Sequence, residues 1–217
     1  MSIDLAQTPT IQAVATADES SLVADLEQRV ATAVRQAESQ PEVVTAAENQ
    51  HKTAQRLAAL SRAQRALNGH AKVITERTGA VREHALDSLI ASAADGGKLD
   101  FKPLNDLLVL EHRGRYVSRA LERLVETQLP LAQVAQMREE SHAAMVLAKA
   151  LEQGARERAE RLLDQLRDAV NEEVVLPVDM SKGVSGALLA QAAEHRRRAL
   201  AISENADRLE KTFMGRQ

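Results

Sequence analysis

The sequence predicts an all-α protein built around an elongated antiparallel coiled-coil hairpin of two long helices. Short N-terminal and C-terminal helices are expected to pack at one end of the hairpin as a three- or four-helix bundle. The chain of 217 residues holds 38 alanines but only one Tyr, two Phe and no Trp, whereas strands favour aromatic and β-branched residues. Long segments lack proline, and apolar residues recur within them every seven residues, as in coiled coils.

Residues 1–17 show no helical period and are expected to form a flexible tail before a single helical domain, residues 18–217. A first helix is expected at about 19–39, because Leu22, Leu26 and Val30 share one face. Pro41 then begins the next helix, since proline is tolerated in a first turn.

The first long helix is expected at about 42–94, a segment without proline. Leu60, Leu67, Ile74 and Val81 recur every seven residues, which indicates left-handed supercoiling. At 1.5 Å per residue this helix would be about 80 Å long. The glycine pair that follows Asp95 ends it, so residues 95–103 are expected to form the tip of the hairpin.

The second long helix is expected at about 104–173, with a kink at Pro130. Whether Pro130 bends or breaks the helix is left open by the pattern. The Val, Pro and Gly content of residues 174–186 predicts an irregular crossover, followed by a final helix at about 187–214.

The final helix carries the most regular heptad of the chain. One seam position holds Leu188, His195, Ile202 and Leu209, and the other holds Ala192, Ala199, Ala206 and Phe213. Repeated alanine lets two helices approach closely, and Leu188, His195, Ile202, Leu209 and Phe213 are candidates for self-association. His195 is either a pH-sensitive element or a polar seam residue that fixes register.

Apolar residues crowd around the expected tip. They are Leu86, Leu89, Ile90, Leu99, Phe101, Leu104, Leu107, Leu108 and Leu110. A two-helix arm has one buried seam and cannot hide all of them, and exposed apolar area usually marks a docking surface. The alternative is that the loop folds back and caps the arm.

The most concentrated polar cluster is Glu111-His112-Arg113-Gly114-Arg115-Tyr116. Glu, His and Tyr are acid–base residues, but consecutive helical residues point in different directions. We therefore take His112, Arg113, Arg115 and Tyr116 as candidates for an anion or partner contact. Gly114 would permit close helix contact or a bend.

Two Glu-x-x-His pairs occur, Glu48/His51 and Glu139/His142, and such pairs bind metal in ferritin-like bundles. Both lie off the apolar stripes of their helices, so we expect them to face water and expect no metal or other cofactor. The three arginines 196–198 are expected to pair with acids of the Glu152–Glu173 segment.

Composition disfavours several functions. The net charge of −3 and the few aromatic residues give neither the basic field nor the stacking platform of nucleic-acid binding. The chain has no cysteine and no apolar run of membrane-spanning length. Its first residues fit neither a secretory signal nor a transit peptide, so we expect no targeting segment. No phosphate-binding or nucleophile motif points to a small-molecule substrate. The expected location is cytoplasmic.

These observations predict a non-enzymatic coiled-coil structural, scaffolding or adaptor protein that presents an apolar tip to a protein partner or a second copy. A peripheral protein that self-assembles on a membrane surface is the first alternative. It requires an amphipathic segment with a basic face, whereas the first 40 residues carry six acids and two bases. A helical-bundle metalloprotein is the second alternative.

Overall fold

The computed structural model describes residues 19–94, 100–172 and 180–215 of the chain. Within these ranges every regular element is a helix, which confirms the all-α prediction. The elements are α1 (Glu19–Glu38), α2 (Pro41–Ala94), α3 (Lys102–Arg123), the π-helical turn η1 (Leu124–Gln128), α4 (Leu129–Glu172) and α5 (Met180–Met214).

The helix bounds agree with the sequence pattern except before α5. The predicted crossover is wrong over residues 180–186, because α5 already begins at Met180. Gly183 misled the prediction, since it is a helical residue here and not a breaker. A Cβ atom on Gly183 would lie 3.1 Å from Cδ1 of Leu26, so the missing side chain makes room for α1. The predicted tail at 1–17 and residues 174–179 of the crossover lie outside the described residues.

The chain divides into two compact units. Unit 1 comprises Met1–Gln40 and Leu147–Glu194, and unit 2 comprises Pro41–Val146 and His195–Gln217. Helices α4 and α5 each contribute one part to either unit.

Unit 1 is a three-helix bundle of α1, the second part of α4 and the first part of α5. Its core is formed by small and aliphatic side chains: Ala33, Ala37, Ala148, Ala150, Leu151, Ala155, Val184, Leu188 and Ala192. At its rim Arg158 donates a hydrogen bond of 3.1 Å to Gln36, and Ser185 donates one of 3.4 Å to the backbone oxygen of Ala155. Alanine-rich surfaces allow these helices to lie close together.

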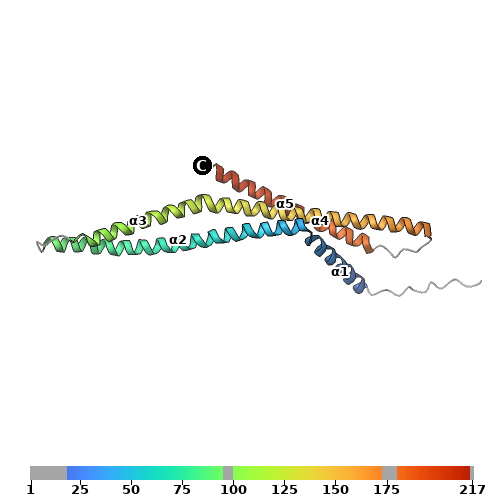
Figure 1. Ribbon diagram of the computed structural model, residues 1–217, viewed down its shortest axis with the longest axis horizontal. Coiled ribbons are helices and arrows are strands. Elements are labelled where there is room, and N and C mark those ends of the chain that lie inside the picture. The colour runs from blue at the N-terminus through green and yellow to red at the C-terminus, as the bar shows by residue number, and fades with distance from the viewer. Residues whose placement is uncertain (1–18, 95–99, 173–179, 216–217) are drawn as a thin grey trace, which may run out of the picture. The chain divides into compact units, whose positions relative to one another are not determined.

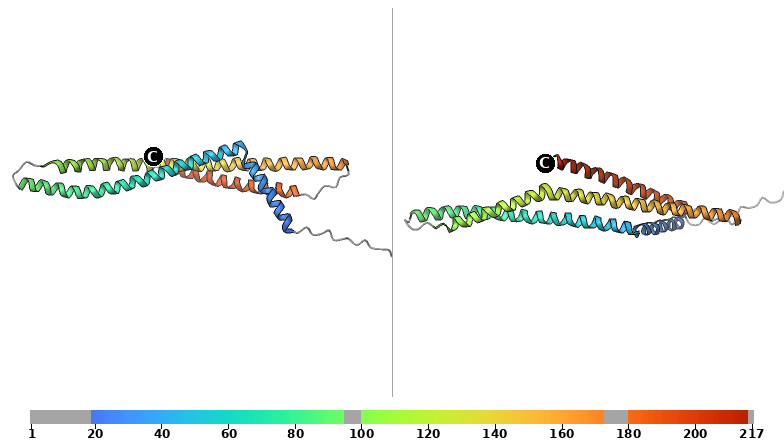
Figure 2. Two further views of the ribbon diagram at one scale, coloured as in Figure 1. Left: turned by 60° about the horizontal axis from the view of Figure 1, so that its bottom comes forward. Right: turned by 45° about the horizontal axis from the view of Figure 1, so that its top comes forward.

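Unit 2 contains the predicted hairpin, in which α2 and α3 lie antiparallel and side by side (Figures 1 and 2). Residues with reduced exposure recur along α2 at alternating steps of three and four, which is the spacing of a coiled-coil seam. Toward the hairpin end, Ala85 and Leu107 are the only buried ones among the residues that the structure describes. The arm is therefore a two-helix structure whose other seam residues keep part of their surface exposed.

Pro130 does not break the helical run, because it is the second residue of α4 and directly follows the π-helical turn η1. The preceding turn is π-helical, and the Leu129 N–H donates to the backbone oxygen of Leu124, five residues earlier. Proline has no N–H to donate, and π turns are a known site of helix bending. The run bends at this turn (Figure 1), as the predicted kink requires.

The π turn also shifts the seam by one residue. Buried or half-buried residues of α3 and η1 follow the series Leu110, Gly114, Val117, Leu121 and Leu124. A continuous heptad would next place Leu131 in the seam, yet Leu131 is 50% exposed and Ala132 is buried at 7%. The extra residue of the wide turn thus rotates the face that α4 buries.

In unit 2 the first part of α4 packs against the second part of α5. Ala199 and Ala206 of α5 are fully buried, and Ser141 of α4 donates a hydrogen bond of 2.8 Å to the backbone oxygen of Ala199. Arg198 donates to Glu140 across the same helix pair at 2.7 Å. The prediction that arginines 196–198 pair with acids of the Glu152–Glu173 segment is wrong for Arg198, because the register of α4 and α5 brings Glu140 opposite it.

The side chains at the two predicted seam positions of α5 differ in how far they are buried. The alanine line, with Ala192, Ala199 and Ala206, has no exposed surface. Leu188 is buried inside unit 1, whereas His195, Ile202, Leu209 and Phe213 are half-buried. The alanines form the contact line, and the larger side chains flank it.

We expect Ala199→Leu to lower the free energy of unfolding by about 1–3 kcal/mol, because extra methylenes in a packed contact force neighbours apart. Ala201→Leu is the matched control, since Ala201 is exposed two positions along the same helix, and it should change stability by less than about 0.5 kcal/mol. Urea denaturation followed by circular dichroism measures both. Equal stabilities of the two variants would contradict the buried alanine line.

Gly114→Ala should stabilise the hairpin by about 0.5–1 kcal/mol, because alanine has the higher helix propensity. A Cβ atom on Gly114 would lie 3.4 Å from Cγ2 of Ile74, an ordinary contact, while Gly69 has open space around it. Thermal unfolding of Gly114→Ala and Gly69→Ala compares the two sites. If Gly114→Ala destabilises the protein and Gly69→Ala does not, the α2–α3 seam leaves no room for a methyl group.

Candidate functional site

The hairpin end of unit 2 exposes large apolar side chains on both helices. Leu86 is 57% and Ile90 is 67% exposed near the end of α2, and Phe101 is 52% and Leu108 is 55% exposed at the start of α3. We call these four residues the apolar tip. Leu99, which the sequence also placed here, lies outside the described residues.

The remaining candidates of the crowded segment belong to the α2–α3 seam. Leu107 is buried, and Leu89, Leu104 and Leu110 are half-buried. Two helices share one line of contact, so each helix buries one stripe and leaves its other apolar residues outside. The alternative of a loop that caps the arm involves residues 95–99, which the structure does not describe.

Local hydrogen bonds fix the start of α3 directly behind the apolar tip. The Lys102 N–H donates to the Asp100 carboxylate at 3.0 Å, and the Asn105 N–H donates to the Phe101 backbone oxygen at 3.0 Å. Pro103 occupies the first turn, where no N–H is needed. Phe101 is thereby held at the helix start with half of its surface exposed.

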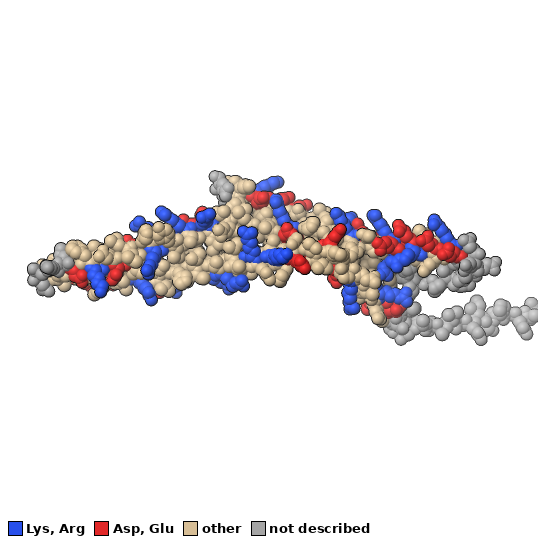
Figure 3. Space-filling model, in the orientation of Figure 1, with Lys and Arg blue, Asp and Glu red and all other residues tan. Residues whose placement is uncertain are grey.

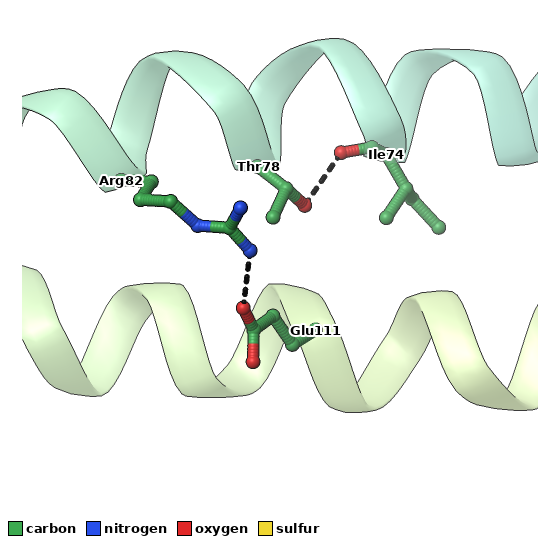
Figure 4. A network of polar contacts seen from close by, with 4 residues as sticks. All are labelled: Ile74, Thr78, Arg82 and Glu111. Atoms are coloured by element: carbon green, nitrogen blue, oxygen red, sulfur yellow. Dashed lines mark hydrogen bonds and ion pairs between the residues drawn. The ribbon is translucent and has the colours of Figure 1, made fainter.

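The polar cluster of α3 divides between two faces of the helix. Glu111 faces α2 and accepts a hydrogen bond of 2.8 Å from Arg82 (Figure 4). One turn away on α2, the Thr78 hydroxyl donates to the Ile74 backbone oxygen at 2.7 Å. Gly114 lies against Ile74, which supports the prediction of close helix contact. Glu111 and Arg82 therefore form a partly exposed ion pair that links α3 to α2.

His112, Arg113, Arg115 and Tyr116 lie on the exposed side of α3. The rings of His112 and Tyr116 meet edge to face, with centroids 4.7 Å apart and planes at 89°. A shallow open hollow of about 470 Å³ is lined by Leu108, Val109, Glu111, His112, Arg113 and Arg115. Along α3, the apolar tip is thus followed by a polar and cationic surface.

Sequence reasoning missed three members of this surface. Val109 is 50% exposed, and Arg119 and Arg123 are exposed further along α3. A helical-wheel projection from Phe101 to Arg123 would have found them, because each residue turns by about 100°. In Figure 3 Lys and Arg side chains are spread along this hairpin, with Asp and Glu between them.

The two Glu-x-x-His pairs do not form a site. Glu48 and His51 are exposed, and the Gln55 side-chain nitrogen lies 2.8 Å from Nε2 of His51. Glu139 is half-buried, whereas His142 is exposed. Among the described residues no three His, Cys, Asp or Glu side chains are close enough together to hold a metal ion.

Unit 1 contains one small hollow of about 70 Å³ among the described residues, between α1, α4 and α5. Ala33, Ala37, Leu151 and Leu188 line its floor, and Gln36 and Arg158 lie at its edge. Pockets that take small molecules typically measure about 300–1,000 Å³, so this hollow is a gap in the helix packing with room for water.

The described helices include none that is both long and apolar enough to cross a membrane. The chain matches no protein-family model, no curated protein and no solved structure.

Proposed function

We propose that the chain is a non-enzymatic coiled-coil scaffold or adaptor protein that presents the hairpin end of α2 and α3 to a protein partner. The observation that carries this proposal is the apolar tip: Leu86, Ile90, Phe101 and Leu108 are each more than half exposed at one end of a single helix pair. Exposed apolar surface of this kind is typical of docking sites.

Burial of the apolar tip by a partner would stabilise the complex. Full burial of a Leu, Ile or Phe side chain contributes about 1.5–3 kcal/mol, and half of this gain is still available to a side chain that is half exposed. The tip side chains lie on helices that are already formed. Little backbone entropy is therefore lost on binding, and preorganisation of this kind favours affinity.

The length of α2 gives the arm its reach. Its 54 residues form a helix of about 80 Å, paired with α3 along the hairpin. A partner held at the apolar tip is therefore kept away from the part of α2 that begins at Pro41. This separation is the property that a scaffold or adaptor needs.

Self-association is a second part of the proposal. The half-buried residues His195, Ile202, Leu209 and Phe213 flank the alanine line of α5 and leave part of their apolar surface for a second copy. A cytoplasmic location remains a proposal. Among the described residues no cluster of metal ligands supports the metalloprotein alternative, and the exposed Asp87, Asp100 and Asp106 near the hairpin end disfavour the membrane-surface alternative.

A photo-crosslinking amino acid at position 90 tests the proposal in the cells that produce the protein. We expect a discrete crosslinked protein at this position, and we expect Leu86→Ser with Phe101→Ser to abolish it, because both substitutions remove apolar contact area. Position 55, an exposed glutamine in the first third of α2 and far from the apolar tip along the helix, is the control. Identical adducts from positions 90 and 55, or none from position 90, would contradict a docking tip.

A further inference from the structure

Helix α3 has two apolar faces that lie on opposite sides. One face, with Leu107 and Gly114, packs against α2. At about 100° per residue, Phe101, Leu108, Val109 and Tyr116 lie about 100–180° around the helix axis from Leu107. Each of these four side chains is 50% or more exposed. One helix partner cannot cover both faces, so the second face stays open in the hairpin.

Arginines continue the open face toward the π turn. Arg115, Arg119 and Arg123 recur at steps of four, and Arg113 lies at the edge of the face. All four are exposed, and none forms an ion pair with another residue in the described ranges. Over residues 112–123 the only acid is Glu122. The open face is thus apolar near the tip and cationic beyond it.

We infer that the outer face of α3, from Phe101 to Arg123, binds an acidic amphipathic helix of a protein partner. This inference rests on the proposed function and names the chemistry of the partner. Apolar side chains of that helix would pack on Phe101, Leu108 and Val109. Its carboxylates, about two to four turns further along, would accept hydrogen bonds from Arg115, Arg119 and Arg123.

Backbone chemistry favours a helix as the occupant. The N–H and C=O groups within α3 are already paired, so the face offers no edge to which a strand could add. Helices pack on helices by inserting side-chain ridges into grooves, and Phe101 and Leu108 are spaced seven residues apart, as anchors for such packing require. Arginine forms paired, charge-assisted hydrogen bonds to carboxylates, which makes acidic residues the complement of the cationic half.

The charge distribution favours a protein helix over an anionic membrane. Asp87, Asp100 and Asp106 are exposed around the same end of the hairpin. A flat anionic surface would meet these carboxylates together with the arginines and repel them. A single helix contacts only the outer face of α3, so it can avoid them.

Selection from a displayed library of helical peptides, with the full chain as bait, tests the inference. The library varies apolar, acidic and basic residues independently. We expect enrichment of peptides with an apolar stripe followed by Asp and Glu. Their affinity should fall at least about tenfold for Arg115→Glu/Arg119→Glu/Arg123→Glu, which corresponds to a loss of about 1.4 kcal/mol. The neutral triple Arg115→Gln/Arg119→Gln/Arg123→Gln should show a smaller fall in the same direction.

The matched control is Arg56→Glu/Arg62→Glu/Arg65→Glu, which makes the same change of charge at exposed positions of α2 and should leave binding unchanged. Circular dichroism verifies that each variant remains helical. Enriched peptides without acids, equal loss in the control, or no enriched peptide would each overturn the inference. Binding of the enriched peptides could instead be unaffected by the arginine variants and abolished by Leu86→Ser/Ile90→Ser. That result would overturn the inference about α3 and leave the proposed function standing. If the chain binds phosphatidylserine vesicles through these arginines and binds no acidic peptide, the outer face of α3 is a lipid-binding surface. This result would also overturn the inference.

Discussion

Two helices that pack side by side share a single line of contact, and this constraint governs the hairpin. Each helix can bury one stripe of side chains, so every further apolar residue stays on the surface. Near the end of the arm, Ala85 and Leu107 take the buried stripe, while Leu86 and Leu108, their immediate neighbours in sequence, remain more than half exposed. The apolar tip and the outer face of α3 are consequences of this geometry.

The other helix contacts follow a different principle, which is small side chains at close range. Ala148, Ala155 and Ala192 in unit 1, and Ala199 and Ala206 in unit 2, have almost no exposed surface. Serine appears twice within this line, and each time its hydroxyl donates to an alanine carbonyl of the opposite helix: Ser141 to Ala199 and Ser185 to Ala155. Both pairs follow one antiparallel register. Alanine and serine thus replace the large core residues that this composition lacks.

Much of the fold could be predicted from the sequence, because periodicity and breakers determine helices directly. The bounds of α2 follow from Pro41 and from the glycines after Asp95, and the heptad of Leu67, Ile74 and Val81 indicates the face of α2 that is turned toward α3. The start of α5 could not be predicted. Gly183 resembles a breaker in sequence, and its role as a space for Leu26 depends on a residue far away in the chain.

The candidate site could be predicted only in part for a similar reason. Sequence identified the crowd of leucines, but the choice between Leu107 in the seam and Leu108 outside it depends on the register with α2. Arg119 and Arg123 were missed because they lie outside the local cluster of polar residues. They join Phe101 and Leu108 only when the residues are projected around the helix axis.

The π turn at Leu124–Gln128 also determines which side of α4 is buried. A wide turn takes up one additional residue while the helical run continues. Ala132, and not Leu131, therefore lies on the buried side. Deletion of one residue within this turn would restore an uninterrupted heptad and rotate α4 by about 100°, so that a different side of α4 would meet its neighbours.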